Sequence, residues 1–237
     1  MSLELSYYFR QPEKFPIDGF LDGVQSPCEL LAKAKSVLNS LLVEPDVHEN
    51  NGAVRCGTLH TCGNLVIGEG TVIYGDVTII GPVFIGRNCE IMPGAVIRPY
   101  SIIGDNCSVG HGSEVKRGLL FAGAKVASLA FVGDSVLGAA ARIGSGVITA
   151  NRKFDQTGVT LKLQGVRHDL GDTYFGLVLG DSSRLGANSV SQPGTHIGPH
   201  TWIYPMTSVR GFIPREKRVG HGQSLQMADN AVVELKP

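Results

Sequence analysis

Arg98 and Lys116 are the residues of this chain whose types and spacing are best suited to binding an anion. Each directly follows an aliphatic residue of a six-residue repeat, Ile97 or Val115, and the two cations are 18 residues apart. If three repeats form one coil of a solenoid, both side chains lie on the same face about 5 Å apart. Stacked cations repel unless an anion or a carboxylate lies between them. The pair therefore predicts a phosphate site with a bidentate arginine and a lysine point charge. The alternative is neutralisation by Glu114 or by a neighbouring chain.

The elements that must position this pair come from a hexapeptide repeat in the middle of the chain. Small residues such as Cys89 and Cys107 fall four positions after the repeated aliphatic residue. A six-residue period is typical of a parallel β-helix with three strands per coil, here about six coils. We therefore expect an all-β solenoid with the aliphatic residues pointing inward. The regular aliphatic positions are Ile67, Ile73, Ile79, Ile85, Ile91, Ile97, Ile103, Val109 and Val115.

The period also indicates where the solenoid is interrupted. It slips near Ala127, because the following pairs Val132-Gly133 and Leu137-Gly138 are only five residues apart. It then stops at about residue 150 and resumes at Leu179. We expect residues 150–176 to leave the solenoid, with a short hairpin where Val159, Leu161 and Leu163 alternate with polar residues. The expected solenoid spans residues 51–210, and residues 211–237 form a tail.

Residues 1–50 precede the repeat and combine an irregular aromatic segment with one expected helix. Ser26-Pro27 resembles an N-cap followed by proline at the first helical position. The next residues place a leucine-rich stripe on one side of a helix. Because an open solenoid end exposes strand edges and apolar core, we expect this helix to cap one end.

Composition excludes several classes of protein. The 237 residues carry a formal net charge of zero, which argues against a nucleic-acid-binding protein. No run of 18 apolar residues exists, so no transmembrane helix or membrane partner is expected. The first residues lack a basic stretch followed by an apolar one, so no signal peptide is expected. Five cysteines without regular spacing predict buried free thiols in the cytoplasm.

Three stretches carry a resemblance to a known family. VIRPYSIIGDNCSVGHGSEVK (96–116) and GAKVASLAFVGDSVLGAAARIGSGVITAN (123–151) resemble the acetyltransferase domain of bifunctional glucosamine-1-phosphate acetyltransferase/N-acetylglucosamine-1-phosphate uridylyltransferase. FGLVLGDSSRLGANSVSQPGTHIG resembles the C-terminal domains of archaeal-type sugar-1-phosphate nucleotidylyltransferases. These belong to the hexapeptide-repeat transferase superfamily. The resemblance implies a left-handed β-helix, a homotrimer and a cytoplasmic role in nucleotide-sugar metabolism. No glycine-rich nucleotide-binding motif precedes the repeat, so uridylyl transfer by this chain alone is not expected.

The resemblance also assigns the sugar-phosphate site residue by residue. Arg98 and Lys116 match the arginine and lysine that hold the sugar phosphate in the family. The family's catalytic histidine, which deprotonates the sugar amine, is replaced by Ser128. The sugar-contacting tyrosine falls at Phe131 and the sugar-contacting asparagine at Arg142. Because a serine hydroxyl cannot act as a base near pH 7 without a partner, the ordinary reaction is in doubt.

The cofactor implied by the resemblance is acetyl-CoA or another acyl-CoA. Asn151 matches an asparagine near the cofactor groove, and Ala187 matches a small residue that lines it. Arg152 departs from the family's tyrosine, although it could attract the phosphates of CoA. Asp134 is shared with the family, and we interpret it as a turn-forming residue.

Histidines elsewhere in the chain are the remaining candidates for a base. His111, His168, His196 and His200 are considered, and His168 of a neighbouring chain could reach the site in a trimer. Nothing near Ser128 forms a Ser-His-Asp set that would make it a nucleophile. The seven histidines lack the closely spaced pair of a zinc site, so no metal is expected.

Three hypotheses follow from these residues. The first is a sugar-phosphate acyl- or acetyltransferase of the sugar-nucleotide pathway with a rearranged base. The second is a non-catalytic protein that binds a sugar phosphate or nucleotide sugar, or that partners a separate nucleotidylyltransferase. The third is an oligomer whose solenoid only scaffolds the aromatic N-terminal segment. The phosphate site expected at Arg98 and Lys116, called the clamp, favours the first two hypotheses. Ser128, in place of the family's base, argues against the ordinary reaction and favours the second.

Overall fold

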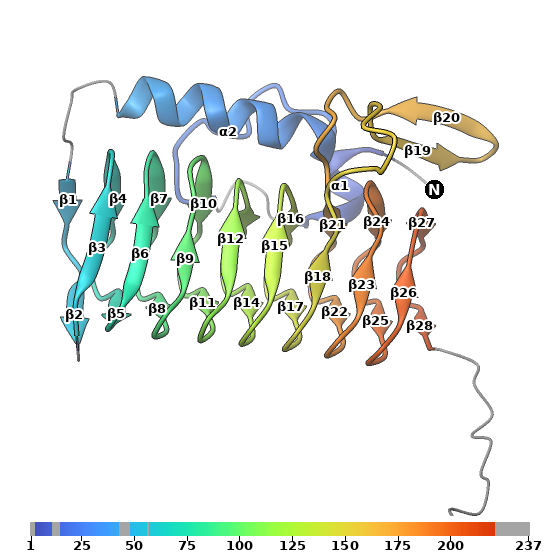
Figure 1. The fold of residues 1–237 in the computed structure, drawn as a ribbon. Helices are drawn as coiled ribbons and strands as arrows, with labels where there is room; N and C mark the ends of the chain where they lie inside the picture. Colours follow the sequence, from blue (N-terminus) through green and yellow to red (C-terminus); the bar gives the residue numbers. More distant parts are fainter. Residues whose placement is uncertain (1–2, 11–14, 43–47, 56, 221–237) are drawn as a thin grey trace, which may run out of the picture.

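The computed structural model describes residues 3–10, 15–42, 48–55 and 57–220. The chain winds into a three-sided prism in which successive coils lie side by side (Figure 1). Each side is a parallel sheet, with nine strands in sheet A, nine in sheet B and eight in sheet C. The all-β solenoid is therefore confirmed, but it has more coils than the expected six. The sequence pattern did not include the first and last coils, because the aliphatic residues there are not regularly spaced.

The strands follow one another in the order A, B, C along the chain. Sheet A contains β1 (His48–Asn50), β4 (Leu65–Ile67), β7 (Val83–Ile85), β10 (Ser101–Ile103), β13 (Leu119–Leu120), β16 (Val136–Leu137), β21 (Leu177–Leu179), β24 (Thr195–Ile197) and β27 (Phe212–Ile213). Sheet B contains β2 (Ala53–Arg55), β5 (Val72–Tyr74), β8 (Glu90–Ile91), β11 (Ser108–Val109), β14 (Lys125–Val126), β17 (Arg142–Ile143), β22 (Arg184–Leu185), β25 (Trp202–Ile203) and β28 (Arg218–Val219). Sheet C contains β3 (Leu59–Cys62), β6 (Val77–Ile80), β9 (Val96–Ile97), β12 (Glu114–Lys116), β15 (Phe131–Gly133), β18 (Ile148–Thr149), β23 (Val190–Ser191) and β26 (Ser208–Val209). The expected limits of 51 and 210 are too narrow, because β1 begins earlier and β27 and β28 lie later.

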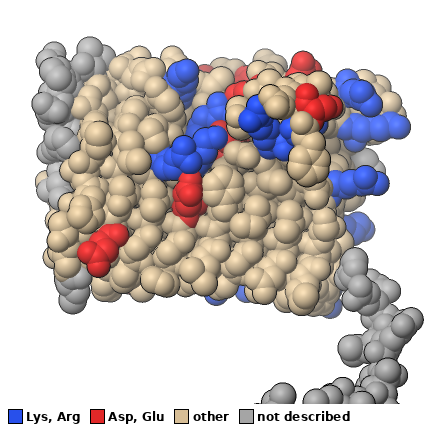
Figure 2. Space-filling view, in the orientation of Figure 1, with Lys and Arg blue, Asp and Glu red and all other residues tan. Residues whose placement is uncertain are grey.

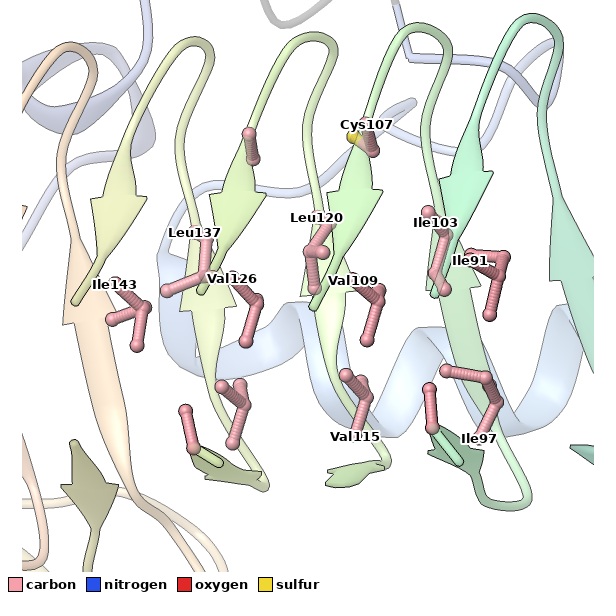
Figure 3. Close-up of a cluster of buried hydrophobic side chains, with 14 of the residues drawn as sticks. Ile91, Ile97, Ile103, Cys107, Val109, Val115, Leu120, Val126, Leu137 and Ile143 are labelled. Carbon is pink, nitrogen blue, oxygen red and sulfur yellow. The ribbon is translucent and has the colours of Figure 1, made fainter. Parts of the chain in front are cut away.

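The repeated aliphatic residues form the core of the prism, as predicted. Their side chains converge from all three sheets, and none of the regular positions is measurably exposed (Figure 3). The small residues occupy the corners and bond to the neighbouring coil. Thr71 Oγ1 donates to the carbonyl of Gly86 at 2.7 Å, and Cys89 Sγ donates to that of Gly104 at 3.1 Å. Each fully buried aliphatic side chain contributes about 1.5–3 kcal/mol to folding.

The N-terminal residues form a second layer on the outer face of sheet A. Helix α1 (Leu5–Tyr8) and helix α2 (Pro27–Leu41) lie along this face, and α2 runs across successive coils (Figure 1). Ser26 caps α2 as predicted, with its hydroxyl accepting from the backbone N–H of Cys28 at 3.2 Å. The expected position over an open end is wrong, because the apolar stripe of α2 packs on outward-facing residues of sheet A. These are Ile102, Leu119, Val136 and Val178.

The chain leaves the solenoid between β18 and β21, where the sequence predicted an excursion. This segment, residues 150–176, is called the arm. It contains the antiparallel hairpin of β19 (Thr160–Leu163) and β20 (Val166–Asp169). Val159 and Leu161 are buried against the N-terminal layer, so the arm continues the covering of sheet A.

The repeat is shortened at two turns, of which the sequence analysis found one. The five-residue spacing from Val132 to Leu137 is confirmed, and a second one runs from Val115 to Leu120; all four of these residues point into the core. The position near Ala127 is wrong, because Val126 and Val132 keep the six-residue spacing across it. Both short turns join sheet C to sheet A, an edge of the prism called the C–A corner. Shortening there changes the strand register from Ile97↔Val115 to Val115↔Val132.

The prediction of buried free thiols is confirmed for only two of the four described cysteines. Cys89 and Cys107 are buried, Cys28 is half-buried and Cys62 is exposed, and all four are free. Cys56 lies outside the described residues. No helix in the described part of the chain combines the length and hydropathy needed to cross a bilayer.

Candidate functional site

Arg98 and Lys116 lie on adjacent coils of the C–A corner, as their spacing predicts. The strands before them pair in register, and the backbone N–H of Arg98 donates to the carbonyl of Val115 at 2.8 Å. Both side chains line a pocket of about 290 Å³ between the corner, helix α2 and the arm. The lining residues are Lys35, Arg98, Pro99, Tyr100, Lys116, Arg117, Asp134 and Tyr174.

Arg98 is paired with a carboxylate of the next coil. Its guanidinium donates to Glu114 Oε1 at 2.7 Å, and the side chains are 42% and 35% exposed. The neutralising role considered for Glu114 in the sequence is therefore present. Such an exposed pair contributes about 0–1 kcal/mol, so a phosphate could compete for the guanidinium at little cost.

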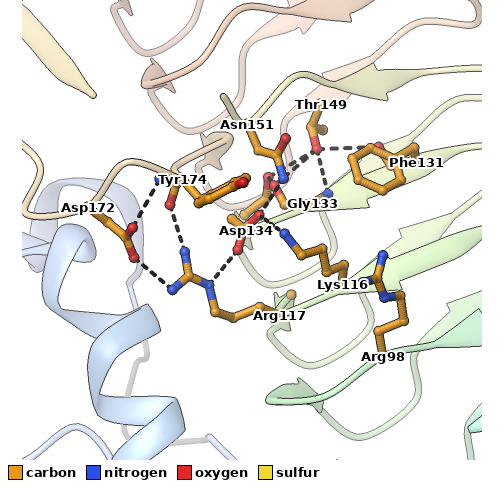
Figure 4. Close-up of polar contacts among 12 residues, drawn as sticks. Arg98, Lys116, Arg117, Phe131, Gly133, Asp134, Thr149, Asn151, Asp172 and Tyr174 are labelled. Atoms are coloured by element: carbon orange, nitrogen blue, oxygen red, sulfur yellow. Dashed lines mark hydrogen bonds and ion pairs between the residues drawn. The ribbon is translucent and has the colours of Figure 1, made fainter. Parts of the chain in front are cut away.

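Asp134 is the centre of the polar contacts at this corner (Figure 4). Its carboxylate accepts from Lys116 Nζ at 3.1 Å, from Arg117 Nε at 2.5 Å and from the side-chain amide of Asn151. The side chain is only 2% exposed, and its backbone has a φ of 48°, typical of a tight turn. Asp134 therefore forms the turn expected from sequence. It also holds the side chains of Lys116, Arg117 and Asn151 in place.

Arg117 connects this corner to the arm. One guanidinium nitrogen donates to Asp172 Oδ2 at 2.7 Å and another to the carbonyl of Tyr174 at 2.7 Å. Burial alone would raise the pKa of Asp172, but the backbone N–H of Tyr174 and the guanidinium of Arg117 hold it below its usual value. Arg117 was missed in the sequence, although the short spacing from Val115 to Leu120 marks its turn as unusual.

Two tyrosines, also missed from sequence, form the walls of the pocket. Lys116 Nζ lies 4.5 Å from the centre of the Tyr174 ring, and the guanidinium of Arg152 lies 5.2 Å from it. Lys35 Nζ lies 5.6 Å from the ring centre of Tyr100. Figure 2 shows cationic side chains gathered along this edge beside α2 and the arm. The pocket therefore combines cations with aromatic surface.

The structure separates the remaining predicted substrate residues within one chain. Phe131 begins β15 on sheet C and lies in register with Glu114. Ser128 lies at the corner between sheets B and C, at the opposite side of sheet C from Lys116. Arg142 is exposed on sheet B, in register between Lys125 and Arg184. Phe131 thus lies on sheet C between the corner of Lys116 and the corner of Ser128, whereas Arg142 lies on a different sheet.

The predicted cofactor residues are divided between two corners. Asn151 and Arg152 begin the arm at the C–A corner, where Asn151 is bonded to Asp134. Ala187 lies at the B–C corner, two coils after Ser128, and its carbonyl accepts from Met206. One chain alone therefore does not bring all three together.

The candidate histidines also lie apart. His111 is one coil before Ser128 at the B–C corner, and its Nδ1 lies 2.8 Å from the carbonyl of Pro93. His168 lies on the arm beside the start of α2, away from Ser128. His196 is fully buried under the N-terminal layer, and burial lowers its pKa to about 4. His200 is exposed at the corner between sheets A and B. The described residues contain no group of three or more His, Cys, Asp or Glu suited to a metal.

Comparisons with known proteins place this geometry in a family. The family model for the GMPPB C-terminal domain matches residues 79–166. A bifunctional sugar-1-phosphate nucleotidylyltransferase/acetyltransferase of Sulfurisphaera tokodaii is 30% identical over 208 residues, which are 87% of this chain and 49% of the relative. The chain thus spans about half the length of that relative. The solved UDP-N-acetylglucosamine acyltransferase of Francisella novicida is 18% identical, with a TM-score of 0.48, over 69% of this chain and 60% of that one.

YaiX, an uncharacterized acetyltransferase of Escherichia coli strain K12, is matched over a larger share of its length. It is 34% identical over 154 residues, covering 65% of this chain and 67% of the relative. Together with the triangular parallel solenoid, this similarity shows that the chain belongs to the hexapeptide-repeat transferase superfamily, whose fold is the left-handed parallel β-helix.

Proposed function

We propose that this protein is an acyltransferase of the sugar-nucleotide pathway that binds a hexosamine phosphate at the C–A corner. The observation that carries the proposal is the pair of Arg98 and Lys116, which lie on adjacent coils and line one pocket. A phosphate dianion can accept from both, in place of the carboxylates that now hold them. The sugar ring then extends along sheet C past Phe131 toward Ser128.

The acyl donor in this proposal is acetyl-CoA or another acyl-CoA. The sugar amine attacks the thioester carbonyl, the new C–N bond forms, the C–S bond breaks and CoA leaves as a thiol. Because the expected donor residues Asn151 and Ala187 lie at different corners, we propose that a homotrimer completes the donor groove with a neighbouring chain.

The attacking amine must lose a proton to a base as the C–N bond forms. Ser128 stands where the family has its base, and the loss of a positioned base costs about 10²- to 10⁴-fold in rate. His111, on the adjacent coil of the same corner, is the histidine that we propose as an alternative base. A slow transferase is therefore expected with an ordinary hexosamine phosphate.

The same observation at Ser128 favours a second candidate function. Without a base, the geometry of the pocket would serve a non-catalytic protein that binds a sugar phosphate or nucleotide sugar, alone or beside a separate nucleotidylyltransferase. The two candidates share the anion pocket and differ only in turnover of the acyl donor.

Replacing Arg98 or Lys116 with alanine is expected to weaken binding of glucosamine-1-phosphate by about 10- to 100-fold. Each substitution removes hydrogen bonds to a charged group, worth about 1.5–3 kcal/mol. Titration calorimetry measures the affinity, and release of free thiol from acetyl-CoA measures turnover. Lys125→Ala is the matched control, since Lys125 is exposed on sheet B away from the pocket.

The outcomes separate the candidates. Thiol release that depends on the sugar phosphate supports the transferase. Binding without thiol release supports the binding protein. If the alanine variants bind as tightly as the wild type, the clamp at Arg98 and Lys116 is wrong.

A further inference from the structure

Lys35 lines the same pocket as Arg98 and Lys116, although it belongs to the N-terminal layer. It lies in the middle of α2, which packs along sheet A and so carries this residue to the C–A corner. Its ammonium group lies 5.6 Å from the ring centre of Tyr100, which also lines the pocket. A third segment of the chain thus reaches the pocket.

The charges around the pocket do not cancel, and Lys35 carries the excess. Arg98 is paired with Glu114, and Lys116 with Asp134. Arg117 is paired with both Asp134 and Asp172. Four cations therefore face three carboxylates, which leaves one positive charge.

The contacts of Lys35 leave its donors available. No ion pair or hydrogen-bond acceptor for its ammonium group is present in the described part of the chain. A cation over an exposed aromatic ring is worth about 0.5–1 kcal/mol, which positions the ammonium without using its three N–H donors. A phosphate between Arg98 and Lys116 would supply acceptors for them.

We propose that Lys35 is a direct contact for the phosphate of the bound sugar, so that the N-terminal layer forms part of the site. This inference rests on the proposed function and adds a ligand-binding residue that lies outside the solenoid. The bound phosphate is then held by three cations from α2 and from two coils, in a pocket that Tyr100 and Tyr174 also line.

The test compares Lys35→Met with the wild type in titrations with glucosamine-1-phosphate. We expect affinity to fall about 10- to 100-fold, as for loss of a hydrogen bond to a charged group. Lys35→Arg should retain most of the affinity. Lys125→Met removes the same charge from sheet B and should leave affinity unchanged. Inorganic phosphate should show the same order of variants, and glucosamine without phosphate should show no difference between them.

Three results would count against the inference, and they differ in what else they overturn. If Lys35→Met binds normally while Arg98→Ala is weakened, Lys35 is no contact and the proposed function stands. If Lys35→Met and Lys125→Met are weakened equally, only net charge matters and the contact is again wrong. If the wild type binds neither glucosamine-1-phosphate nor inorganic phosphate, the proposed function fails together with the inference.

Discussion

Replacing Asp134 with alanine is expected to lower the free energy of unfolding by about 3–5 kcal/mol. The carboxylate is 2% exposed and neutralises Lys116 and Arg117, which are themselves only 26% and 18% exposed. Its removal leaves Lys116, at the same turn, without an ion pair, and leaves Asp172 as the one carboxylate paired with Arg117 among the described residues. It also frees the amide of Asn151. Urea unfolding followed by circular dichroism measures the change.

A matched control distinguishes the effect of burying a carboxylate from the effect of losing an ion pair. Asp172 bonds to the same Arg117, but its side chain is 37% exposed. Asp172→Ala should therefore cost only about 0–1 kcal/mol, the range of surface pairs. Equal effects of the two substitutions would show that burial of Asp134 does not set its contribution.

Acidification from pH 7 to pH 4 is expected to remove about 3 kcal/mol of stability through His196 alone. The imidazole is fully buried between the rings of Tyr8 and Phe175, and burial lowers its pKa from 6.5 to about 4. Its Nδ1–H donates to the carbonyl of Gly194 at 3.1 Å, while Nε2 faces the thiol of Cys28 at 3.7 Å. The folded protein therefore stabilises the neutral form of the His196 imidazole.

The direction of this effect follows from proton uptake. Between pH 6.5 and pH 4 the unfolded chain binds a proton at His196 that the folded chain does not, so stability falls as the pH falls. The contribution is complete above pH 6.5 and lost by about pH 4. Unfolding midpoints across this range measure the slope for the wild type and for His196→Phe.

The variant and its control isolate this histidine from other titrating groups. His196→Phe keeps an aromatic ring between Tyr8 and Phe175 but cannot be protonated, so its stability should vary less with pH. Its stability at pH 7 should be lower, because the Gly194 carbonyl loses its donor. His60→Gln, at an exposed position of β3, should keep the wild-type slope. An unchanged slope in His196→Phe would show that other groups cause the acid sensitivity.

The sequence was sufficient to predict the solenoid and the placement of Arg98 beside Lys116, because both depend on a fixed period. A buried aliphatic every six residues determines the strand order and inward face, and an 18-residue spacing places Arg98 beside Lys116. The position of the helix was predicted wrongly, although a signal was present. Sheet A strands carry two adjacent aliphatic residues, which is typical of a sheet buried on both faces. These pairs are Ile102-Ile103, Leu119-Leu120, Val136-Leu137 and Val178-Leu179.

The residues that complete the site could not be predicted, because they depend on tertiary placement. Lys35 and Tyr174 come from segments without the six-residue period, and only packing on sheet A brings them to the C–A corner. Arg117 looks like an ordinary turn residue until the arm folds back onto it. Periodicity defines distances along a coil, whereas it contains no information on what covers a face.

The covering of sheet A also has a consequence for the order in which the molecule is assembled. The backbone N–H of Arg10 bonds to the carboxylate of Asp181, 171 residues later, and the N–H of Arg215 bonds to the hydroxyl of Tyr7, 208 residues earlier. During synthesis residues 3–10 emerge well before these partners, which follow 171 and 208 residues later. The coils can form from neighbouring contacts as they leave the ribosome, whereas the segment must wait with its aromatic side chains undocked. Residues 3–10 and 15–42 are therefore made before the coils that they cover and reach their native place after them.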